Sequence, residues 1–498
     1  MGRRLRALAV LSGALGMSFA ALAIDARAPA VAADRCTAPG ATIPGEVLSP
    51  GWERSYRSGC RDDAGKLAGG SEVLHLVPHK AKLYAAVGYW MDPRNPWYGG
   101  SPVDGSWAQV LRLDGPNARW QVDLDMPMHL RPEILHSATF TTDGGGRPLP
   151  SPVNLLLAAA YQGNGDGGIS LFTRDDATGA WTKSKIIDKP TGKKGEENSV
   201  RAMRVHRDKM TGVDRLFVSI GVMGIFSGVY DPAAPGKIRW DQRSESGPLT
   251  MRPLAIVEAN GALFFSSDRF VYRRVDGPQP RYEKVVQIDD SGGGSTFSPV
   301  GGIRGMTAID NPAGPGQSLL LVWAPGNRSR SCILRFDPSA SGVYTRTDEI
   351  CLDTLIRQYL HGVPAPYVLA GYNELLAVPD PATNGIKNLI GMSEWVSGVS
   401  AHTTQSKGKD GGFYAGALYA VRDAAAHYSM GEVNGPIKSS NPDLVATRAY
   451  ALSPFPEDGG RVIYFGGYDC NFTPSPDTAW IFRTSLANAL GETSARKP

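Results

Sequence analysis

A seven-fold internal repeat is the feature of this 498-residue sequence that most constrains its fold. Each repeat opens with a short apolar strand. In six repeats a charged residue begins that strand: Glu72, Glu133, Arg201, Arg252, Arg304 and Arg448. The remaining repeat has a weaker start in PYVLAGYN, residues 366–373. Such a pattern predicts copies of one supersecondary unit that bury their apolar faces against one another.

Three more strands are predicted in each repeat. The second is a β-prone run rich in small residues, such as KLYAAVGYW at 82–90, and the third resembles VLRLDG at 110–115. The fourth opens with an aromatic residue in six repeats: Trp120, Trp181, Trp240, Tyr282, Tyr344 and Tyr428. The 59 glycines and 37 prolines fit many short strands joined by turns. The one predicted helix spans 353–360.

The last repeat lacks a fourth strand of its own, because little sequence follows TAWIFRTSLANAL at 478–490. The segment GWERSY at 51–56 has the same aromatic-led form and precedes the first repeat. We therefore expect this N-terminal segment to supply the missing outer strand, which pairs an otherwise open sheet edge. The sequence predicts an all-β, seven-bladed β-propeller of four-stranded antiparallel blades, as one domain over 34–498. Its topology resembles the seven-bladed β-propeller superfamily, with neither a WD40 nor a kelch signature.

Residues 1–33 predict a secretory signal peptide. They have a basic start at Arg3, Arg4 and Arg6, an apolar run over 7–24, and small residues around 30–33. An uncleaved anchor is the alternative, because the apolar run is about long enough to cross a bilayer. We expect a secreted or periplasmic, monomeric mature protein with no later membrane-spanning segment.

Five cysteines in an oxidising compartment predict two disulfides and one remaining thiol. Cys332 and Cys351 flank a predicted hairpin and would face each other across it. Cys36 and Cys60 bracket the first strand and would staple the N-terminus. Cys470 is then unpaired, and its role stays open.

Six charged residues stand at the starts of the repeats in a mature chain that is nearly neutral overall. Residues 1–33 contain four arginines and one aspartate, so their removal leaves a net charge near +1. This balance argues against a nucleic-acid partner, which needs a clustered basic excess. Inner strands of a propeller normally start at the ligand-binding face, so the six charged starts should ring the mouth of the central channel. One interpretation is that the two glutamates pair with arginines and lock the blades in register. The other is that the excess guanidinium groups bind an anion.

Three neighbouring repeats have long connections between their second and third strands, at 90–106, 393–412 and 468–476. Long loops in a compact domain are often functional, and these would form a wall beside the channel mouth. The aromatic residues displayed there would be Tyr89, Trp90, Trp97, Tyr98, Trp395 and Tyr468. Aromatic rings beside fixed charges favour an acidic carbohydrate or an acidic partner segment as the ligand.

The sequence contains no complete catalytic motif, so binding without turnover is the first prediction and an enzyme is the alternative. In the enzyme alternative, a polysaccharide lyase, an arginine neutralises a uronate while Tyr89, Tyr468 or His402 removes the proton. A glycosidase would instead use Glu72 and Glu133.

Two histidines and one calcium-like segment complete the candidates. His75 and His136 occupy equivalent positions and are predicted to point away from the channel. The segment QGNGDGG at 162–168 matches a calcium loop only in part, so no metal site is predicted. The sequence identifies no cofactor.

Overall fold

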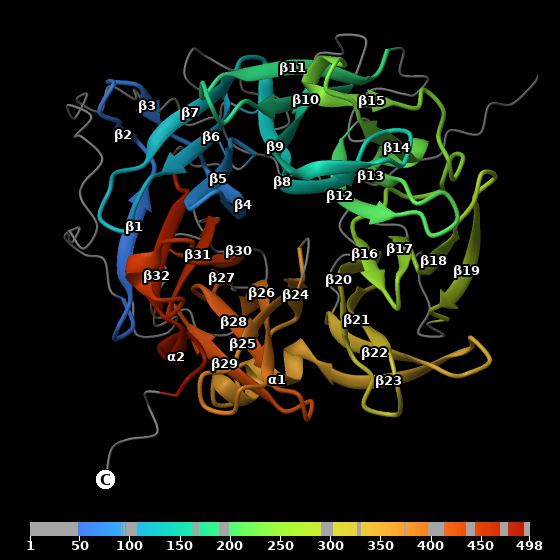
Figure 1. The fold of residues 1–498 in the computed structure, drawn as a ribbon. Helices are drawn as coiled ribbons and strands as arrows, with labels where there is room; N and C mark the ends of the chain where they lie inside the picture. The colour runs from blue at the N-terminus through green and yellow to red at the C-terminus, as the bar shows by residue number, and fades with distance from the viewer. Residues whose placement is uncertain are drawn as a thin grey trace, which may run out of the picture.

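Seven antiparallel sheets surround a common axis, and the first strand of each sheet lies nearest that axis (Figure 1). The computed structural model describes residues 48–90, 92, 95, 107–162, 169–188, 199–289, 302–325, 330–372, 375–396, 413–434, 444–468 and 477–492. Within these ranges the seven-bladed β-propeller prediction is confirmed. Residues 1–33 and Cys36 lie outside them, so the predicted signal peptide and domain boundary stay predictions.

Each of the first five blades is built from four consecutive strands. Blade 1 contains β4 (Glu72–His79), β5 (Lys82–Gly88), β6 (Ala108–Leu113) and β7 (Gln121–Met126). Blade 2 contains β8 (His129–Thr142), β9 (Pro148–Gln162), β10 (Ile169–Arg174) and β11 (Trp181–Ile187). Blade 3 contains β12 (Val200–Arg207), β13 (Asp214–Ile220), β14 (Gly224–Tyr230) and β15 (Ile238–Trp240). Blade 4 contains β16 (Ile256–Ala259), β17 (Ala262–Ser267), β18 (Phe270–Val275) and β19 (Arg281–Gln287). Blade 5 contains β20 (Gly302–Asp310), β21 (Gln317–Ala324), β22 (Cys332–Pro338) and β23 (Tyr344–Cys351).

Blade 6 departs from this pattern because its inner strand is broken. Both β24 (Tyr367–Ala370) and β25 (Leu376–Pro379) pair with β26 (Ile386–Val396), and β27 (Phe413–Tyr414), β28 (Leu418–Arg422) and β29 (Tyr428–Glu432) follow. The helix α1 (Leu352–Tyr359) precedes this blade, one residue from the predicted bounds. A second, short helix, α2 (Leu486–Ala489), was not predicted.

Blade 7 closes the ring with a strand from the N-terminal side of the chain. Its strands are β30 (Ala446–Leu452), β31 (Val462–Tyr468), β32 (Trp480–Ser485) and β1 (Glu53–Arg57). β1 runs antiparallel to β32, with Glu53 opposite Arg483 and Arg57 opposite Trp480. The predicted ring closure is therefore confirmed (Figure 1). A two-stranded hairpin of β2 (Cys60–Arg61) and β3 (Leu67–Ala68) lies between β1 and β4.

The core lies between the blades, and the run LLLAAA at 155–160 of β9 shows why. Leu155, Leu157 and Ala159 pack into the cluster shared with blade 3. The alternate residues Leu156 and Ala158 pack into the cluster shared with blade 1. Successive strand residues face opposite sides, so a strand covered on both faces needs an unbroken apolar run.

The recurring third-strand sequence has a structural role at the outer rim. In four blades, an Arg-x-Asp sequence lies at or just past the end of the third strand. The pairs are Arg112 with Asp114, Arg174 with Asp176, Arg274 with Asp276, and Arg335 with Asp337. Two of these arginines reach the preceding blade. Arg174 lies 2.7 Å from Asp123 and Arg274 lies 2.7 Å from Asp208. We call these contacts the rim ion pairs. Since breaking a buried pair is costly, they hold neighbouring blades together.

The structure also tests the cysteine prediction. Cys332 and Cys351 are paired across β22 and β23 and form a disulfide, as predicted. Cys60 is also disulfide-bonded, but Cys36 and Cys470 lie outside the described residues, so the pairing of Cys60 stays a prediction. A disulfide is typical of an oxidising, extracytoplasmic compartment. No helix among the described residues is long and apolar enough to span a membrane.

Candidate functional site

Seven charged side chains meet where the inner strands begin, and we call them the mouth cluster. Its members are Glu72, Arg131, Glu133, Arg201, Arg252, Arg304 and Arg448. The structure therefore brings together all six charged starts and adds Arg131. The side chains come from β4, β8, β12, β20 and β30, and from the segment just before β16.

The two glutamates each bind more than one arginine. Glu133 accepts a hydrogen bond of 2.5 Å from Arg131, and its other oxygen lies 2.7 Å from Arg201. Glu72 accepts a hydrogen bond of 2.7 Å from Arg448 and lies 3.6 Å from Arg131. The interpretation that the glutamates link neighbouring blades therefore describes part of the cluster.

Among the residues that the structure describes, the cluster joins five guanidinium groups with two carboxylates. Burial alone would raise the pKa of Glu133, but the nearby guanidinium groups of Arg131 and Arg201 outweigh burial and lower it. Burial, together with repulsion from Arg252 and Arg448, lowers the pKa of Arg304 to about 10. Six of the seven residues are at most 9% exposed, and the side chain of Arg448 is 8% exposed. A buried positive excess is costly in a protein interior, and a bound anion would offset that cost.

β-bulges lie at or beside the charged starts and aim these side chains. In β8, which has three register shifts, one extra residue is Glu133, because Pro132 pairs with Ala160 and Ile134 with Ala159. Arg448 is the extra residue in β30. Similar register shifts occur in β4, β12 and β20. Bulges redirect side chains and are frequent next to functional sites.

The same bulges make one sequence prediction wrong. His75 and His136 were predicted to point away from the channel, but both line the central cavity. The extra residue upstream of each histidine shifts the strand's alternation by one position. Burial is the main cause that lowers the pKa of His75 to about 4 and that of His136 to about 3. Both imidazoles are therefore neutral near pH 7.

Aromatic side chains adjoin the mouth cluster on the side of blades 6, 7 and 1. The guanidinium of Arg131 lies 4.3 Å from the centre of the Trp90 ring. In blade 6, Trp395 meets Tyr414 edge to face at 5.1 Å and lies opposite Tyr367. A cationic and an aromatic group thus lie together at Trp90. The ligand-binding roles of Trp90 and Trp395 stay predictions.

The predicted catalytic tyrosines have different surroundings. Tyr468 shares a 2.7 Å hydrogen bond with Tyr372, whose ring centre lies 5.0 Å from the guanidinium of Arg448. Tyr89 is not displayed on the wall as predicted, because it is 1% exposed. Its hydroxyl packs so closely on Gly69 that a Cβ there would approach it to 2.1 Å. Trp97, Tyr98 and His402 lie outside the described residues.

Sequence reasoning missed Arg131 and Tyr372. Arg131 stands two residues before Glu133, so it was a second charge on the same inner strand. Tyr372, with Tyr367, belongs to the repeat that has no charged start. The aromatic residues in that one deviating repeat were the signal, because they occupy the region where other repeats carry charge.

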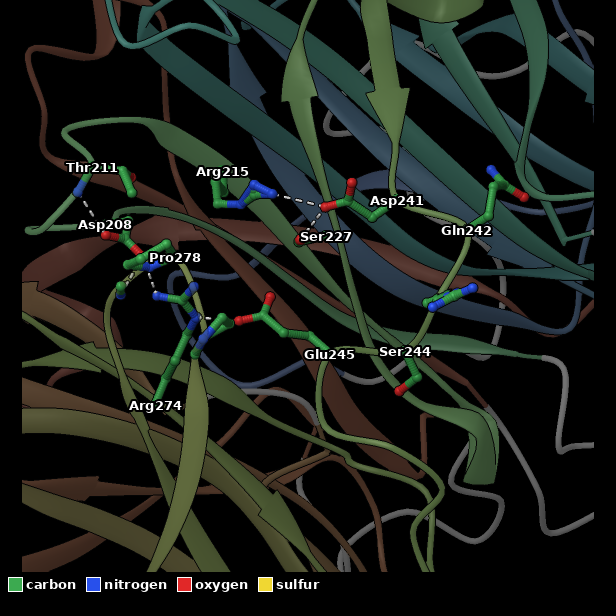
Figure 2. A pocket seen from close by; sticks show the side chains of 13 residues that line it. Asp208, Thr211, Arg215, Ser227, Asp241, Gln242, Ser244, Glu245, Arg274 and Pro278 are labelled. Carbon is green, nitrogen blue, oxygen red and sulfur yellow. Dashed lines mark hydrogen bonds and ion pairs between the residues drawn. The ribbon is translucent and has the colours of Figure 1, made fainter.

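A cavity of about 790 Å³ between blades 3 and 4 is a poorer candidate site (Figure 2). Its charged residues pair with one another: Arg274 lies 2.5 Å from Glu245, and Arg215 lies 2.8 Å from Asp241. The dashed lines in Figure 2 join these groups to each other. The cavity therefore belongs to the rim ion pairs.

No cluster of three or more histidine, cysteine, aspartate or glutamate side chains suited to a metal ion occurs among the described residues. Most of the calcium-like segment at 162–168 lies outside them.

The fold and the mouth cluster together define a seven-bladed β-propeller with a cationic channel mouth. No family model matches the chain, and no curated protein sequence matches it significantly. Among solved structures, it is similar to the extracellular domain of a putative hybrid two-component system from B. thetaiotaomicron, with 9% identity and a TM-score of 0.43. That match covers 83% of this chain but only 38% of the other. A protein from Lactobacillus plantarum is 13% identical with a TM-score of 0.39, over 73% of this chain and 85% of that one.

Proposed function

We propose that this chain is a secreted or periplasmic propeller that binds an anionic ligand at the mouth cluster. The observation that carries the proposal is the meeting of five buried arginines with two glutamates, counted over the part of the chain that the structure describes. Arginine's planar fork suits carboxylate, sulfate or phosphate groups. A ligand of opposite charge would relieve the repulsion that Arg304 experiences from Arg252 and Arg448.

The aromatic surroundings favour an acidic carbohydrate over an acidic partner segment. Trp90, Trp395 and Tyr414 are partly exposed and lie on one side of the mouth. Flat rings beside guanidinium groups suit a sugar that carries a carboxylate, because one face of the sugar can stack while its charge is bound. A peptide would need backbone partners as well.

Calorimetric titration tests this proposal. The mature protein is titrated with uronate oligomers, acidic peptides and neutral glucans of matched length. We expect binding of the uronate oligomers, weakened about tenfold or more in Arg304→Gln, since hydrogen bonds to charged groups contribute about 1.5–3 kcal/mol. Arg346→Gln is the matched control, because Arg346 lies on the same blade in an exposed pair with Asp348. Equal binding of neutral glucans, or unchanged binding by Arg304→Gln, would contradict the proposal.

A uronate lyase is the alternative function, favoured by one specific contact. The hydrogen-bonded phenols of Tyr372 and Tyr468 lie beside Arg448, so a proton acceptor and a carboxylate-binding group adjoin. In this alternative, Arg448 neutralises the uronate and the phenolate form of Tyr468 takes the proton from the carbon beside the carboxylate. The bond to the glycosidic oxygen breaks, and that oxygen leaves with a proton from water. Ultraviolet absorbance of the unsaturated product, lost in Tyr468→Phe, would support it. A flat trace with every uronate polymer would leave only the binding function.

A glycosidase is less compatible with these surroundings. Its general acid must be protonated near neutral pH, but the neighbouring arginines keep the pKa of Glu133 below its usual value.

A further inference from the structure

A separate cavity of about 640 Å³ occupies the central channel beneath the mouth cluster. Its wall contains inner-strand residues from all seven blades, including β4, β8 and β12, which are neighbours around the axis (Figure 1). Arg201 and Arg448 belong both to the mouth cluster and to this wall, so they form the end of the cavity nearest the mouth.

The wall has a positive excess of its own. Its charged or titratable residues within the described ranges are Arg201, Arg204, Arg448, Glu258, His75, His136 and Tyr450. Glu258 lies 3.6 Å from Nδ1 of His206, which is not a wall residue. Arg201 and Arg448 contact Glu133 and Glu72. Arg204 is the cation that remains.

Arg204 and His136 have no hydrogen-bond or ion-pair partner among the residues that the structure describes. Arg204 is exposed, and it lines the cavity. The Nε of Arg448 is buried and lacks a hydrogen-bond acceptor in the same described part of the chain. Donors thus exceed acceptors along this wall.

Arg204 and His136 lie together, with His75 beside them. Arg204 and His75 are the ionisable groups that act most strongly on His136, apart from its burial. The three side chains come from β12, β4 and β8, three consecutive blades. A guanidinium fork beside an imidazole offers N–H donors from two directions, which suits a compact oxyanion.

We propose that Arg204 and His136, with His75 beside them, form a second anion site inside the channel, which binds a small oxyanion of the sulfate or phosphate type. Arg204 donates two hydrogen bonds, and His136 donates one through a ring N–H. The cavity has room for such an ion together with several waters. This site is distinct from the mouth cluster and does not depend on the proposed carbohydrate ligand.

Calorimetric titration of the mature protein with sodium sulfate, sodium phosphate and sodium chloride tests the inference. We expect sulfate and phosphate to bind better than chloride. Arg204→Gln should weaken binding by about tenfold, because it removes a charge-assisted hydrogen bond to the anion. Affinity for sulfate should rise as the pH falls below about 6.5 toward about 4, because the pKa of His136 is lowered to about 3 in the free protein and a bound anion favours the protonated imidazole. His136→Gln should remove most of this pH dependence. Arg147→Gln, a change at an 86% exposed side chain of the same blade as His136, should bind like the wild type.

Two outcomes separate this inference from the proposed function. If Arg304→Gln loses sulfate binding and Arg204→Gln keeps it, the ion binds at the mouth, so the channel site is wrong and the proposed function stands. If uronate binding fails everywhere but sulfate binding depends on Arg204, the proposed function is wrong and the channel site stands. If a variant does not fold, the wild-type protein is titrated with sulfate instead, and the chemical shifts of the histidine ring protons are followed by NMR. No shift at His136, or no sulfate binding at all, overturns the inference.

Discussion

The mouth cluster and the rim ion pairs are both built from buried arginines and carboxylates, yet they differ in charge balance. At the rim, Arg274 is surrounded by Asp208, Glu245 and Asp276, at 2.5 to 2.7 Å. At the mouth, Arg304 experiences repulsion from Arg252 and Arg448. Burial alone would raise the pKa of Asp208, but hydrogen bonds and the charge of Arg274 lower it. Rim arginines therefore stabilise the fold, whereas at the mouth five arginines share two glutamates among the residues that the structure describes.

The largest expected effect tests the rim. Arg274→Met removes a cation whose side chain is 2% exposed and leaves Asp208 and Glu245 without it. We expect the free energy of unfolding to fall by about 3–5 kcal/mol, as measured by denaturant titration. The adjacent Arg273→Met is the control, because Arg273 pairs with Glu283 and both are about one third exposed. Its loss should be below about 1 kcal/mol. Equal effects of the two changes would remove the distinction between rim and surface pairs.

At the mouth, removal of an arginine should weaken ligand binding without lowering the stability of the fold. Arg304→Met removes a charge whose folded-state pKa is depressed, so this charge opposes folding at neutral pH. We expect the melting temperature to stay equal or rise, while binding of an anionic ligand falls by about 1.5–3 kcal/mol. Differential scanning calorimetry with and without the ligand measures both quantities. A loss of stability as large as that of Arg274→Met would show that the mouth is structural too.

The sequence predicted the positions of the blades because their cause is local. Apolar runs such as 155–160 and the aromatic starts of outer strands follow from burial on both faces of each blade. The disulfide between Cys332 and Cys351 followed from one hairpin in the same way. Ring closure by β1 was also predictable, since one repeat lacked a strand and one segment was left over.

The details of the site could not be predicted because they arise between blades. The bulges that turn His75 and His136 into the channel depend on pairing with the second strand, and composition does not reveal this. The burial of Tyr89 depends on Gly69, which lies twenty residues upstream. The difference between balanced rim arginines and unbalanced mouth arginines likewise requires knowledge of which carboxylates lie nearby.

Acidification should remove the stabilising contributions of the channel histidines and of the rim aspartates in different pH ranges. Because the pKa values of His75 and His136 are lowered from 6.5 to about 4 and about 3, these groups support folding only while they are neutral. Their contribution is complete above about pH 6.5 and is lost as the pH falls toward about 4. Rim aspartates such as Asp208, with a pKa lowered from 3.8, lose their contribution only at lower pH.

Denaturant titrations between neutral pH and pH values near 4 measure this separation. We expect the double change of His75 and His136 to glutamine to reduce the decline over that range. Some decline should remain, because burial also lowers the pKa of His79. An unchanged slope in the double variant would mean that these imidazoles do not titrate with folding.

The smallest expected effect concerns the contact between an aromatic ring, Trp90, and an arginine of the mouth cluster, Arg131. Trp90 holds the guanidinium of Arg131 at 4.3 Å, while Arg131 also donates to Glu133. Trp90→Leu removes a cation–π contact of about 0.5–1 kcal/mol, so ligand affinity should fall about two- to fivefold. Trp90→Phe should recover part of this loss, because a ring face remains. If Trp90→Leu instead weakens binding as much as Arg304→Met, the ring contacts the ligand directly, and aromatic stacking rather than charge would be the main source of affinity.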